Sequence, residues 1–478
     1  MFADETSKIT AILEAAIPDE IVALCGRLEA AGHATFVVGG AVRDTLLGLR
    51  PSLADFDVAT AAQPDEVRRL FGFRRTLPIG IKHGTVTVLL GSRDAWRKVE
   101  VTTFRGEGTY VDGRRPESVR FLQTIEEDLA RRDFTINAMA YGPVSRRFVD
   151  PYGGLEDLRR RIIRAVGDPL ARFREDGLRA MRAVRFVATR EMDLDPATRD
   201  AIPLAMETFR KVSMERIRDE LCELLLAPKP SRGLELMRVT GLLGEVLPEL
   251  LEGVGFPQNR FHAYDVWGHT LATVDATPPD LILRLTALFH DVAKPRCAAP
   301  REGAGEEEFR FYHHERLGAT MADAIMRRLK FSNAERERVT HLIANHMFYY
   351  TDEWSPQAVR RFLRHVGTEH VEELFALRAA DVVAAGQGKD PEAEIAPLRE
   401  RVAEVLREAA VLKVSDLAIG GHDVMEALGV SQGPKVGRIL RRLLERVTDD
   451  PTLNTREQLL ALVPEVARED EGGEAQDV

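Results

Sequence analysis

Cysteine is scarce in this sequence, with Cys25, Cys222 and Cys297 as the only three among 478 residues. No two of them are close in sequence, which argues against a cysteine-based zinc site and favours a reducing compartment. The chain also lacks a basic-then-apolar N-terminal segment and any apolar run long enough to span a bilayer. These absences predict a cytoplasmic protein that makes no membrane contact.

An excess of positive charge is also absent. The chain has 66 basic and 76 acidic residues and a net charge of −10, which would argue against a nucleic-acid partner if the charge were evenly spread. The distribution is uneven, because residues 159–190 contain ten arginines and only three acidic residues, Asp168, Glu175 and Asp176. A local basic segment of this kind is what a phosphate-contacting surface needs.

The spacing of apolar residues divides the chain into an α/β part and a longer helical part. Residues 1–31 have helical spacing, and residues 32–150 alternate strand-like with helix-like runs. The predicted strands are Thr35–Val38, Asp55–Ala59, Gly84–Leu90, Lys98–Thr103 and Arg147–Asp150. Later residues are helical and punctuated by Gly and Pro, and the acidic tail 467–478 is expected to be disordered. The predicted fold class is α+β, with a small mixed-sheet head and a long all-α body.

Two short motifs near the N-terminus suit nucleotide chemistry. Gly39-Gly40 is expected to form a tight turn whose backbone N–H groups can approach phosphates, and Arg43 adds a positive charge. Asp55 and Asp57 are two residues apart, so on a strand both side chains leave the same face. Two carboxylates about 4 Å apart repel by roughly 4 kcal/mol at an effective dielectric of about 20. A divalent cation between them would remove that cost.

In this order and spacing, the two motifs resemble the nucleotidyltransferase superfamily related to DNA polymerase β. Residues 131–139, Arg-Arg-Asp-Phe-Thr-Ile-Asn-Ala-Met, resemble the second signature of class II tRNA nucleotidyltransferases, the CCA-adding enzymes. Residues 175–186 resemble their nucleotide-selecting helix, and residues 150–154 and 164–167 resemble the connector. The resemblance implies a polymerase-β-like head that adds C, C and A, or a terminal A, to the tRNA 3′ end without a template. CTP and ATP would be the substrates, and the body would grip the acceptor arm.

The resemblance assigns metal binding in the head to Asp55 and Asp57, which would hold Mg²⁺ for two-metal nucleotidyl transfer. The superfamily usually supplies a third carboxylate from a neighbouring strand. Glu100 is the candidate, because on a strand it points away from the valines on either side of it.

Nucleotide binding in the head is assigned to Gly40, Arg43 and Arg132. Gly40 and Arg43 would hold the triphosphate, and the resemblance places Arg132 at the nucleotide as well. Asp44 and Asp133 each directly follow an arginine. We expect these two carboxylates to orient arginines rather than to bind metal.

Base selection is assigned to Asp176 and Arg179, which on one helix would face the same way, with Arg182 and Arg185 following around the surface. Asp offers only acceptors and Arg only donors. Cytosine and adenine both present an exocyclic amine beside a ring-nitrogen acceptor, whereas uracil and guanine present a carbonyl where that amine sits. An unsatisfied buried group costs roughly 1–3 kcal/mol, so this pair can accept C and A and reject U and G.

A second set of candidate metal ligands lies in the body. His290-Asp291 resembles the signature of HD-domain phosphohydrolases, and the other members follow in the expected order: His269, His314, His346 and Asp381. Imidazoles and carboxylates from separate helices suit one or two divalent transition-metal ions. In relatives that keep this domain, the activity is directed at terminal and cyclic phosphates of RNA. Ala293 stands where many HD proteins have glycine.

Two loops complete the resemblance. Arg105–Pro116 is similar to the flexible loop of full CCA-adding and A-adding members, and residues 432–438 could hold a tRNA phosphate. The predicted domains are a helical lead-in (1–31), the nucleotidyltransferase head (32–150), a helical neck for nucleotide selection and RNA binding (151–255), an HD-type metal-binding domain (256–395), a helical tail contacting tRNA (396–466) and the acidic tail (467–478).

Other functions remain open at this point. Bacterial poly(A) polymerases share the head, but their Gly-Arg-Arg-Phe-type segment is not seen here, where residues 73–76 read Phe-Arg-Arg-Thr. A metal-dependent HD phosphohydrolase with a degenerate head conflicts with intact Asp55, Asp57, Arg132 and Asp176. A non-enzymatic RNA-binding protein would require both metal sites to be empty.

Overall fold

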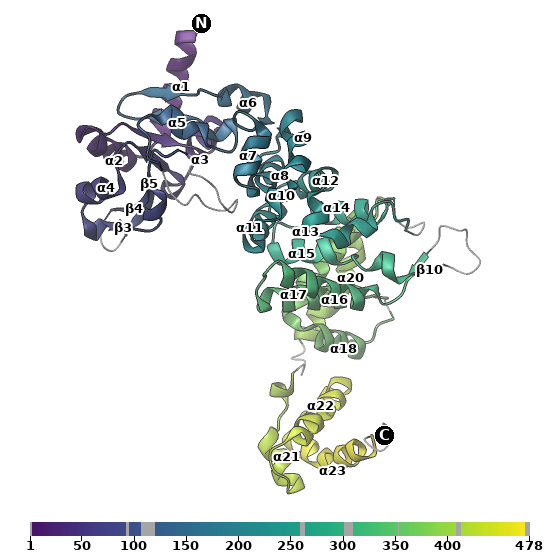
Figure 1. The fold of residues 1–478 in the computed structure, drawn as a ribbon. Helices are drawn as coiled ribbons and strands as arrows, with labels where there is room; N and C mark the ends of the chain where they lie inside the picture. The colour runs from purple at the N-terminus through teal and green to yellow at the C-terminus, as the bar shows by residue number, and fades with distance from the viewer. Residues whose placement is uncertain are drawn as a thin grey trace. The chain divides into compact units, whose positions relative to one another are not determined.

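The computed structural model describes residues 2–91, 95–106, 120–258, 263–300, 309–351, 353–407 and 413–473. The chain forms two compact units (Figure 1): unit 1 comprises Met1–Leu251 with Arg328–Lys330, and unit 2 comprises Glu252–Arg327 with Phe331–Val478. The predicted flexible loop Arg105–Pro116 falls mostly on 107–119, outside the described residues. Among the helices that are described, none has the length and apolar character needed to cross a membrane.

Unit 1 contains a seven-stranded sheet in the order β3-β4-β5-β2-β1-β6-β7. Its strands are β1 (Thr35–Val38), β2 (Asp57–Thr60), β3 (Thr76–Leu77), β4 (Thr85–Leu90), β5 (Arg97–Thr103), β6 (Ala140–Gly142) and β7 (Arg147–Val149). Strand β1 pairs antiparallel with β2 and β6, whereas β2 and β5 are parallel. All four residues of β1 are buried, and its Thr-Phe-Val-Val sequence suits a central strand. The sheet is therefore mixed, as predicted.

Helices pack around this sheet: α1 (Phe2–Ala16), α2 (Asp19–Ala30), α3 (Gly40–Leu46), α4 (Pro64–Phe71), α5 (Ile125–Ala130) and α6 (Gly154–Arg160). Phe36 and Ala140 of the sheet share one buried cluster with Phe104 and with Leu129 of α5. This packing fixes the strand ends that carry the predicted carboxylates and the turn that follows β1.

The rest of unit 1 is helical: α7 (Pro169–Glu175), α8 (Leu178–Arg190), α9 (Pro196–Leu204), α10 (Met206–Phe209), α11 (Met214–Leu225), α12 (Pro230–Val239) and α13 (Leu242–Val246). Helix α8 packs against both α11 and α12. It buries Met181, Val184 and Ala188 at helical spacing. Because α8 is held in this way, the arginines on its other positions have defined directions.

Unit 2 contains α14 (Val266–Ala276), α15 (Leu281–Phe289), α16 (His314–Arg328), α17 (Asn333–Asn345), α18 (Pro356–Val366), α19 (Val371–Ala384) and α20 (Pro391–Arg407). Every residue of α15 from Leu283 to Phe289 is buried, as expected of a helix surrounded by others. Helix α15 contacts α14, α17 and α19. It therefore delivers the His290-Asp291 doublet, which follows it, into the interior of the unit.

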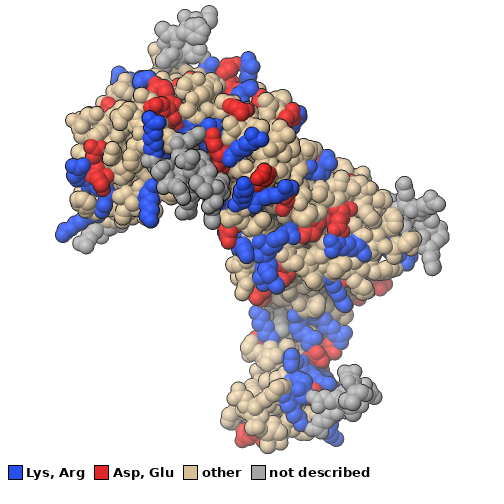
Figure 2. Space-filling model, in the orientation of Figure 1, with Lys and Arg blue, Asp and Glu red and all other residues tan. Residues whose placement is uncertain are grey.

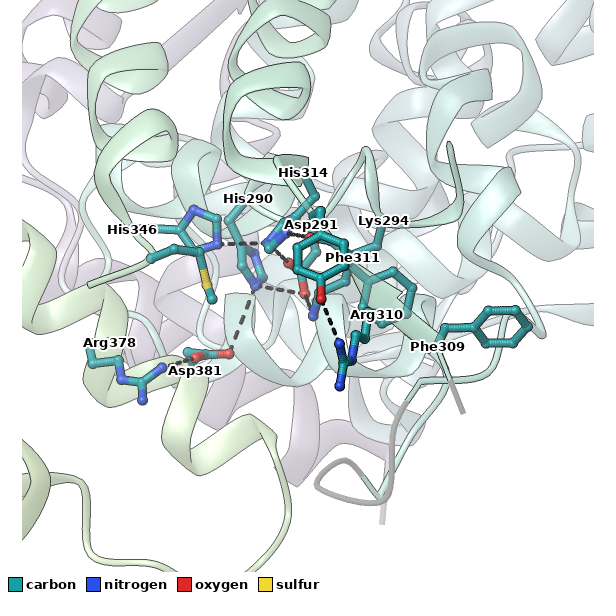
Figure 3. Close-up of a pocket in the computed structure, with 12 residues that line it drawn as sticks. His290, Asp291, Lys294, Phe309, Arg310, Phe311, His314, His346, Arg378 and Asp381 are labelled. Atoms are coloured by element: carbon teal, nitrogen blue, oxygen red, sulfur yellow. Dashed lines mark hydrogen bonds and ion pairs between the residues drawn. The ribbon is translucent and has the colours of Figure 1, made fainter. Parts of the chain in front are cut away.

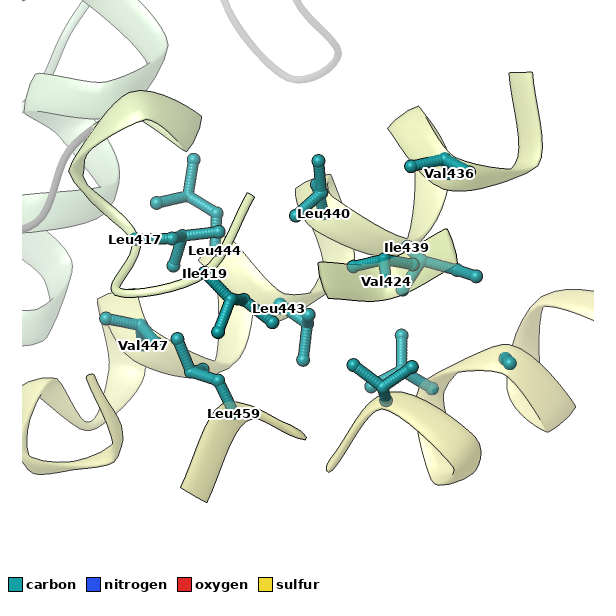
Figure 4. Packing of buried hydrophobic residues seen from close by; sticks show 13 residues of the cluster. Leu417, Ile419, Val424, Val436, Ile439, Leu440, Leu443, Leu444, Val447 and Leu459 are labelled. Atoms are coloured by element: carbon teal, nitrogen blue, oxygen red, sulfur yellow. The ribbon is translucent and has the colours of Figure 1, made fainter. Parts of the chain in front are cut away.

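The last three helices are α21 (Gly421–Leu428), α22 (Pro434–Asp449) and α23 (Arg456–Gly473). They enclose a cluster of leucine, isoleucine and valine side chains (Figure 4), in which Ile439, Leu443 and Val447 of α22 are fully buried. The prediction of a disordered tail at 467–478 is wrong for 467–473, because α23 continues to Gly473. Asp470 is buried and paired with Arg438 of α22 at 2.9 Å, a long-range contact that local composition does not reveal. Residues 474–478 lie outside the described residues.

The predicted fold class is confirmed, with differences in detail. The helical body also contains two small sheets, β8 (Ile162–Ile163) with β9 (Asp193–Leu194) and β10 (Ala298–Pro300) with β11 (Phe309–Phe311). These strands are too short to show a two-residue periodicity in the sequence. The strand predicted at Asp55–Ala59 begins only at Asp57, because Leu53–Asp55 forms a turn of 3₁₀ helix.

Candidate active site and second candidate metal site

The turn predicted at Gly39-Gly40 is present between β1 and α3. Gly39 has φ 71° and ψ −126°, a conformation that favours glycine because it lacks a Cβ. A Cβ at this position would also lie 2.7 Å from Nη1 of Arg132. The Nε of Arg132 is buried and has no hydrogen-bond partner among the described residues. A buried donor beside a glycine turn is the arrangement that an anionic ligand would complete.

Arg43 is held rigidly next to this turn. Its side chain is buried, and its Nε and Nη2 donate to the two carboxylate oxygens of Asp44 at 2.8 and 2.9 Å. Its Nη1 donates to Oδ1 of Asn137 at 2.5 Å. Such a two-pronged contact fixes the plane of the guanidinium. The expectation that Asp44 orients an arginine is confirmed, and Asn137, within the second motif, is a partner that the sequence analysis missed.

The three head carboxylates lie near the start of β2. Asp57 is the first residue of β2, and Glu100 lies on β5, whose Val101 pairs with Val58 of β2. Partial removal from water, together with the charges of Glu100 and Asp55, raises the pKa of Asp57, while Arg132 opposes the shift. The carboxylates therefore repel one another, and oxygen ligands of this kind suit Mg²⁺.

Asp55 departs from the predicted geometry, since it is not on the strand with Asp57. It ends the 3₁₀ turn, and its Oδ2 accepts hydrogen bonds from the backbone N–H and the hydroxyl of Ser52, both at 2.7 Å. This local contact between Ser52 and Asp55 is formed in place of an extension of β2 to Asp55. In the described part of the chain, the head carboxylates are not among the groups whose ligand atoms converge within 4.8 Å.

Asp176 also lies outside the predicted helix. Helix α7 ends at Glu175, Asp176 is extended, and α8 begins at Leu178. The Oδ1 of Asp176 accepts from the N–H of Leu178 at 3.0 Å, and its Oδ2 accepts from Arg216 at 2.8 Å. Asp176 therefore positions the start of α8, one turn before Arg179, and Arg216 is a partner that the sequence analysis missed.

Arg179 is anchored without contacting the Asp176 side chain. It donates to Glu175 at 2.6 Å, to the carbonyl oxygen of Arg172 at 3.0 Å and to that of Arg131 at 2.7 Å. These contacts engage three of the five N–H donors of a guanidinium. The side chain is thus positioned while retaining donor capacity for a further partner.

Gly177, between Asp176 and α8, allows the helix to approach α10 closely. A Cβ there would lie 2.6 Å from Cα of Phe209 and 2.7 Å from the carbonyl oxygen of Thr208. Because backbone would have to move, we expect Gly177→Ala to lower the free energy of unfolding by about 1–3 kcal/mol. Urea unfolding of the full-length protein measures this. Gly26→Ala in α2 is the matched control, since its Cβ would lie 4.0 Å from its nearest neighbour, and equal stability of both variants would contradict the packing argument.

Arg182 joins α8 to the second motif. Its Nε and Nη2 donate to Oδ2 of Asp133 at 2.8 and 2.6 Å. Although burial opposes it, Arg182 and the hydrogen bond from Asn137 hold the pKa of Asp133 well below its usual value. Asp133 thus orients Arg182 rather than the Arg132 that it follows. Arg185 instead pairs with Glu220 of α11 at 2.5 Å.

At least seven of the ten arginines in residues 159–190 pair with carboxylates of the chain: Arg160, Arg164, Arg172, Arg179, Arg182, Arg185 and Arg190. Figure 2 shows basic and acidic side chains interspersed over the visible face. The arginines thus help to hold α8 and its surroundings in place, and the phosphate-contacting surface predicted from this segment stays a prediction.

In unit 2 the six predicted HD residues converge. They form two groups whose ligand atoms lie within 4.8 Å of one another: His269, His290 and Asp381, and Asp291, His314 and His346. Figure 3 shows all of them except His269. The Nε2 of His269 is 3.0 Å from Asp381, and the Nε2 atoms of His314 and His346 are 3.3 Å apart. Residues from five separate helices and their ends are thus brought to one point.

Three of these histidines have a defined tautomer. The Nδ1 atoms of His290, His314 and His346 lie 2.7–2.8 Å from the backbone carbonyl oxygens of Ala287, Phe311 and Ile343. A carbonyl oxygen only accepts, so each Nδ1 carries a proton and each ring turns its Nε2 toward the cluster, where it can serve as a ligand atom when that nitrogen is deprotonated. Burial, with the neighbouring His290 and His314, lowers the pKa of His346 to about 3. The donor set therefore fits divalent transition-metal ions.

Lys294 belongs to this cluster and was missed by the sequence analysis. Its Nζ lies 2.6 Å from Asp291 and donates to Gln258 at 2.8 Å. His290 and Lys294 hold the pKa of Asp291 well below its usual value, although burial opposes the shift. The sequence does contain a signal for Lys294, because it follows Asp291 by three residues. Residues at that spacing lie about one helical turn apart, so their side chains can meet.

The head defines the class of protein: a polymerase-type nucleotidyltransferase, a class that uses divalent metal ions. Residues 35–164 match the family model described as "Poly A polymerase head domain", residues 191–253 that of the "Probable RNA and SrmB- binding site of polymerase A", and residues 312–463 that of "tRNA nucleotidyltransferase domain 2". Relatives that match most of the chain identify the family within this class. The chain belongs to the family of CCA-adding and A-adding tRNA nucleotidyltransferases.

The relatives cover most of the chain. The A-adding tRNA nucleotidyltransferase of Deinococcus radiodurans is 36% identical over 422 residues, 86% of this chain and 90% of the relative. The CCA-adding enzyme of Geobacillus stearothermophilus is 34% identical over 450 residues, 93% and 96% of the two chains. The solved Bacillus stearothermophilus CCA-adding enzyme in complex with CTP is 30% identical, with a TM-score of 0.66 over 95% of this chain and 98% of that one.

Proposed function

We propose that this protein adds C, C and A, or the terminal A, to the 3′ end of tRNA from CTP and ATP without a template. The observation that carries the proposal is the meeting of the Gly39-Gly40 turn, Arg43, Arg132 and the carboxylate group around Asp57 in one head. Relatives that match most of the chain, including one solved with CTP, support the substrates. Three free cysteines support a cytoplasmic location.

In this proposal the head residues hold the triphosphate and the two reacting groups. Asp55, Asp57 and Glu100 would hold Mg²⁺, which would supply charge neutralisation and lower the pKa of the 3′-hydroxyl. The turn at Gly39-Gly40, with Arg43 and Arg132, binds the phosphates. The tRNA 3′ oxygen forms a bond to the α-phosphorus, and the bond to pyrophosphate breaks. The rigid contacts of Arg43 with Asp44 and Asn137 prepare this site before nucleotide binding.

Asp176 and Arg179 select the base. A carboxylate has about four acceptor positions, so Asp176 can accept the exocyclic amine of C or A while keeping its contact with the Leu178 N–H. Arg179 donates to the ring nitrogen through a donor that its backbone and Glu175 contacts do not use. Arg182 and Arg185 act by fixing α8 against Asp133 and Glu220.

Labelled-nucleotide extension of tRNA transcripts tests the function. One transcript ends before CCA and the other ends in CC, and each is given CTP, ATP or both. A CCA-adding enzyme completes both and stops, whereas an A-adding enzyme extends only the second. Continued addition of A would instead identify a poly(A) polymerase, and no addition would overturn the proposal.

The division of labour along the chain belongs to the same proposal. The lead-in 1–31 supports the head 32–150, the neck 151–255 selects nucleotide and contacts RNA, and the tail 396–466 contacts tRNA. The match of residues 191–253 to an RNA-binding model supports the role of the neck. In the tail, Lys435 lies in the first turn of α22, after Gly433, where a helix N-terminus favours a phosphate.

The region 256–395 forms a second site that we propose to be a metal-dependent HD phosphohydrolase. Two converging groups of three ligands support it. Bound transition-metal ions would lower the pKa of a water molecule and so supply a hydroxide nucleophile.

Removing one ligand should weaken metal binding at this second site. We expect His290→Ala and His346→Ala to lose at least about half of the Mn²⁺ or Zn²⁺ that the native protein retains after dialysis. Groups that only hydrogen-bond to the ligands orient them and cannot replace a missing donor atom. Mass spectrometry of the dialysed protein measures the metal content. His341→Ala is the matched control, since its ring bonds to the Val366 carbonyl outside the cluster. Unchanged metal in both ligand variants would contradict the assignment, and nucleotide addition should be spared in all three.

A further inference from the structure

The cavity beside the second candidate metal site has an aromatic wall. It has a volume of about 380 Å³ and is lined by Phe309, Phe311 and Tyr312 as well as by the candidate metal ligands. Figure 3 shows Phe309 and Phe311 on the same side of the cavity as Arg310. Coordination of a metal ion needs no aromatic side chains, so a wall of this kind indicates a ligand that has a flat ring.

The aromatic side chains of the wall pack against a further phenylalanine, and their strand contacts one of the candidate metal ligands. Phe256 packs against Phe309 and Phe311 at ring distances of 5.6 and 6.5 Å. Lys294 lies 5.6 Å from the centre of the Phe311 ring. The carbonyl oxygen of Phe311 accepts the Nδ1 proton of His314 at 2.7 Å. The strand that carries the aromatic rings therefore also sets the direction of one metal ligand.

Tyr312 is fixed in direction although its ring is open to solvent. Its hydroxyl accepts a hydrogen bond from Nη1 of Arg310 at 2.8 Å, while 59% of the residue is exposed. An exposed aromatic ring held in place at the mouth of a pocket is suited to stacking.

The same cavity is lined by cationic groups that suit a phosphate. Lys294 and Arg378 both line it, and they contact the carboxylates of Asp291 and Asp381 at 2.6 and 3.0 Å. With metal ions at the histidines, the inner end of the cavity would be positive. A flat ring at the mouth and an anion at the inner end together describe a nucleotide.

We propose that Phe311 and Tyr312 stack the base of an unpaired nucleotide whose phosphate faces the histidine cluster. The cavity is thereby specific for nucleoside phosphates over small phosphoanions. This inference rests on the proposed metal site. Stacking of a base on an aromatic side chain typically changes affinity by about tenfold or more, which corresponds to about 1.4 kcal/mol per factor of ten.

Calorimetric titration of Mn²⁺-loaded protein tests the inference. The protein carries Asp57→Ala to remove metal from the head, and the ligand is guanosine 3′-monophosphate, whose base the head is proposed to reject. Ribose 5-phosphate and inorganic phosphate are the matched ligands without a base. We expect the guanosine nucleotide to bind about tenfold more tightly than ribose 5-phosphate.

Substituting the aromatic residues of the wall should weaken binding of the guanosine nucleotide and leave binding of inorganic phosphate nearly unchanged. Phe311→Ala and Tyr312→Ala are expected to weaken the guanosine nucleotide about tenfold and to leave inorganic phosphate within about twofold. The exposed Tyr312 keeps the test valid if Phe311→Ala does not fold. Tyr349→Ala is the control, because this ring is 81% exposed and does not line the cavity. Equal affinity for guanosine and ribose phosphates, or unaltered binding in both variants, would overturn the inference. Failure of the protein to bind Mn²⁺ would overturn the metal site, and this inference with it.

Discussion

Asp57→Ala and Asp55→Ala are each expected to reduce nucleotide addition by at least about a thousandfold. Metal ions at a transferring phosphate supply several kcal/mol of charge stabilisation, and each 1.36 kcal/mol is a factor of ten in rate. Steady-state addition of labelled CTP and ATP to a tRNA transcript measures the loss. Binding of tRNA, measured by filter retention, should remain within about twofold, since the carboxylates repel rather than attract phosphates.

A neighbouring surface carboxylate provides the control for these variants. Asp65→Ala removes an exposed acid in the first turn of α4, and we expect a rate close to that of the native protein. Glu100→Gln then tests the third carboxylate: a loss comparable to that of Asp57→Ala would place Glu100 on the metal. Persisting activity in Asp55→Ala or Asp57→Ala would contradict the metal assignment. The Asp55→Ala variant is especially informative, because Oδ2 of Asp55 already accepts two hydrogen bonds from Ser52 and so has an alternative structural role.

Asp176→Ala should relax the choice of base toward UTP. The carboxylate is proposed to leave the uracil carbonyl unsatisfied, at roughly 1–3 kcal/mol, so its removal should reduce discrimination between CTP and UTP by about tenfold or more. The ratio of kcat/KM for the two nucleotides on one tRNA transcript measures this. An unchanged ratio would show that the base is not read by Asp176.

Two further variants separate selection from folding. Asp200→Ala removes an exposed carboxylate of α9 that is paired with its neighbour Arg199, and it should leave the ratio unchanged. Arg216→Ala removes the ion pair at Asp176 but keeps the carboxylate. We expect Arg216→Ala to retain the preference for C and A, because the acceptor remains. If Arg216→Ala relaxes selection as far as Asp176→Ala does, the ion pair rather than the carboxylate carries the specificity.

Short motifs in the sequence predicted which residues meet, but not always how they meet. The Gly39-Gly40 turn, Arg43 with Asp44, and the six residues of the HD cluster were all predicted, because residue type and order carry that chemistry. The strand predicted at Asp55 failed, since Ser52 captures its carboxylate in a local turn. Periodicity cannot reveal that competition between a capping contact and an extended backbone.

Long-range packing explains the other differences. Asp176 is extended and accepts from the Leu178 N–H at the start of α8, while Arg216, far away in sequence, holds its carboxylate. Asp133 pairs with Arg182 instead of the adjacent Arg132 for the same reason, since α8 lies over the second motif. The acidic tail was taken as disordered from its composition, although Arg438 gives Asp470 a buried partner.

Crystals of the protein with CTP and Mn²⁺ would test the central claim most directly, because anomalous scattering locates the metal and the density locates the base. The account predicts Mn²⁺ bound by Asp55 and Asp57, and the cytosine amine within hydrogen-bond distance of Asp176 with its ring nitrogen facing Arg179. Metal bound away from both carboxylates, or cytosine bound beyond the reach of Asp176 and Arg179, would contradict it.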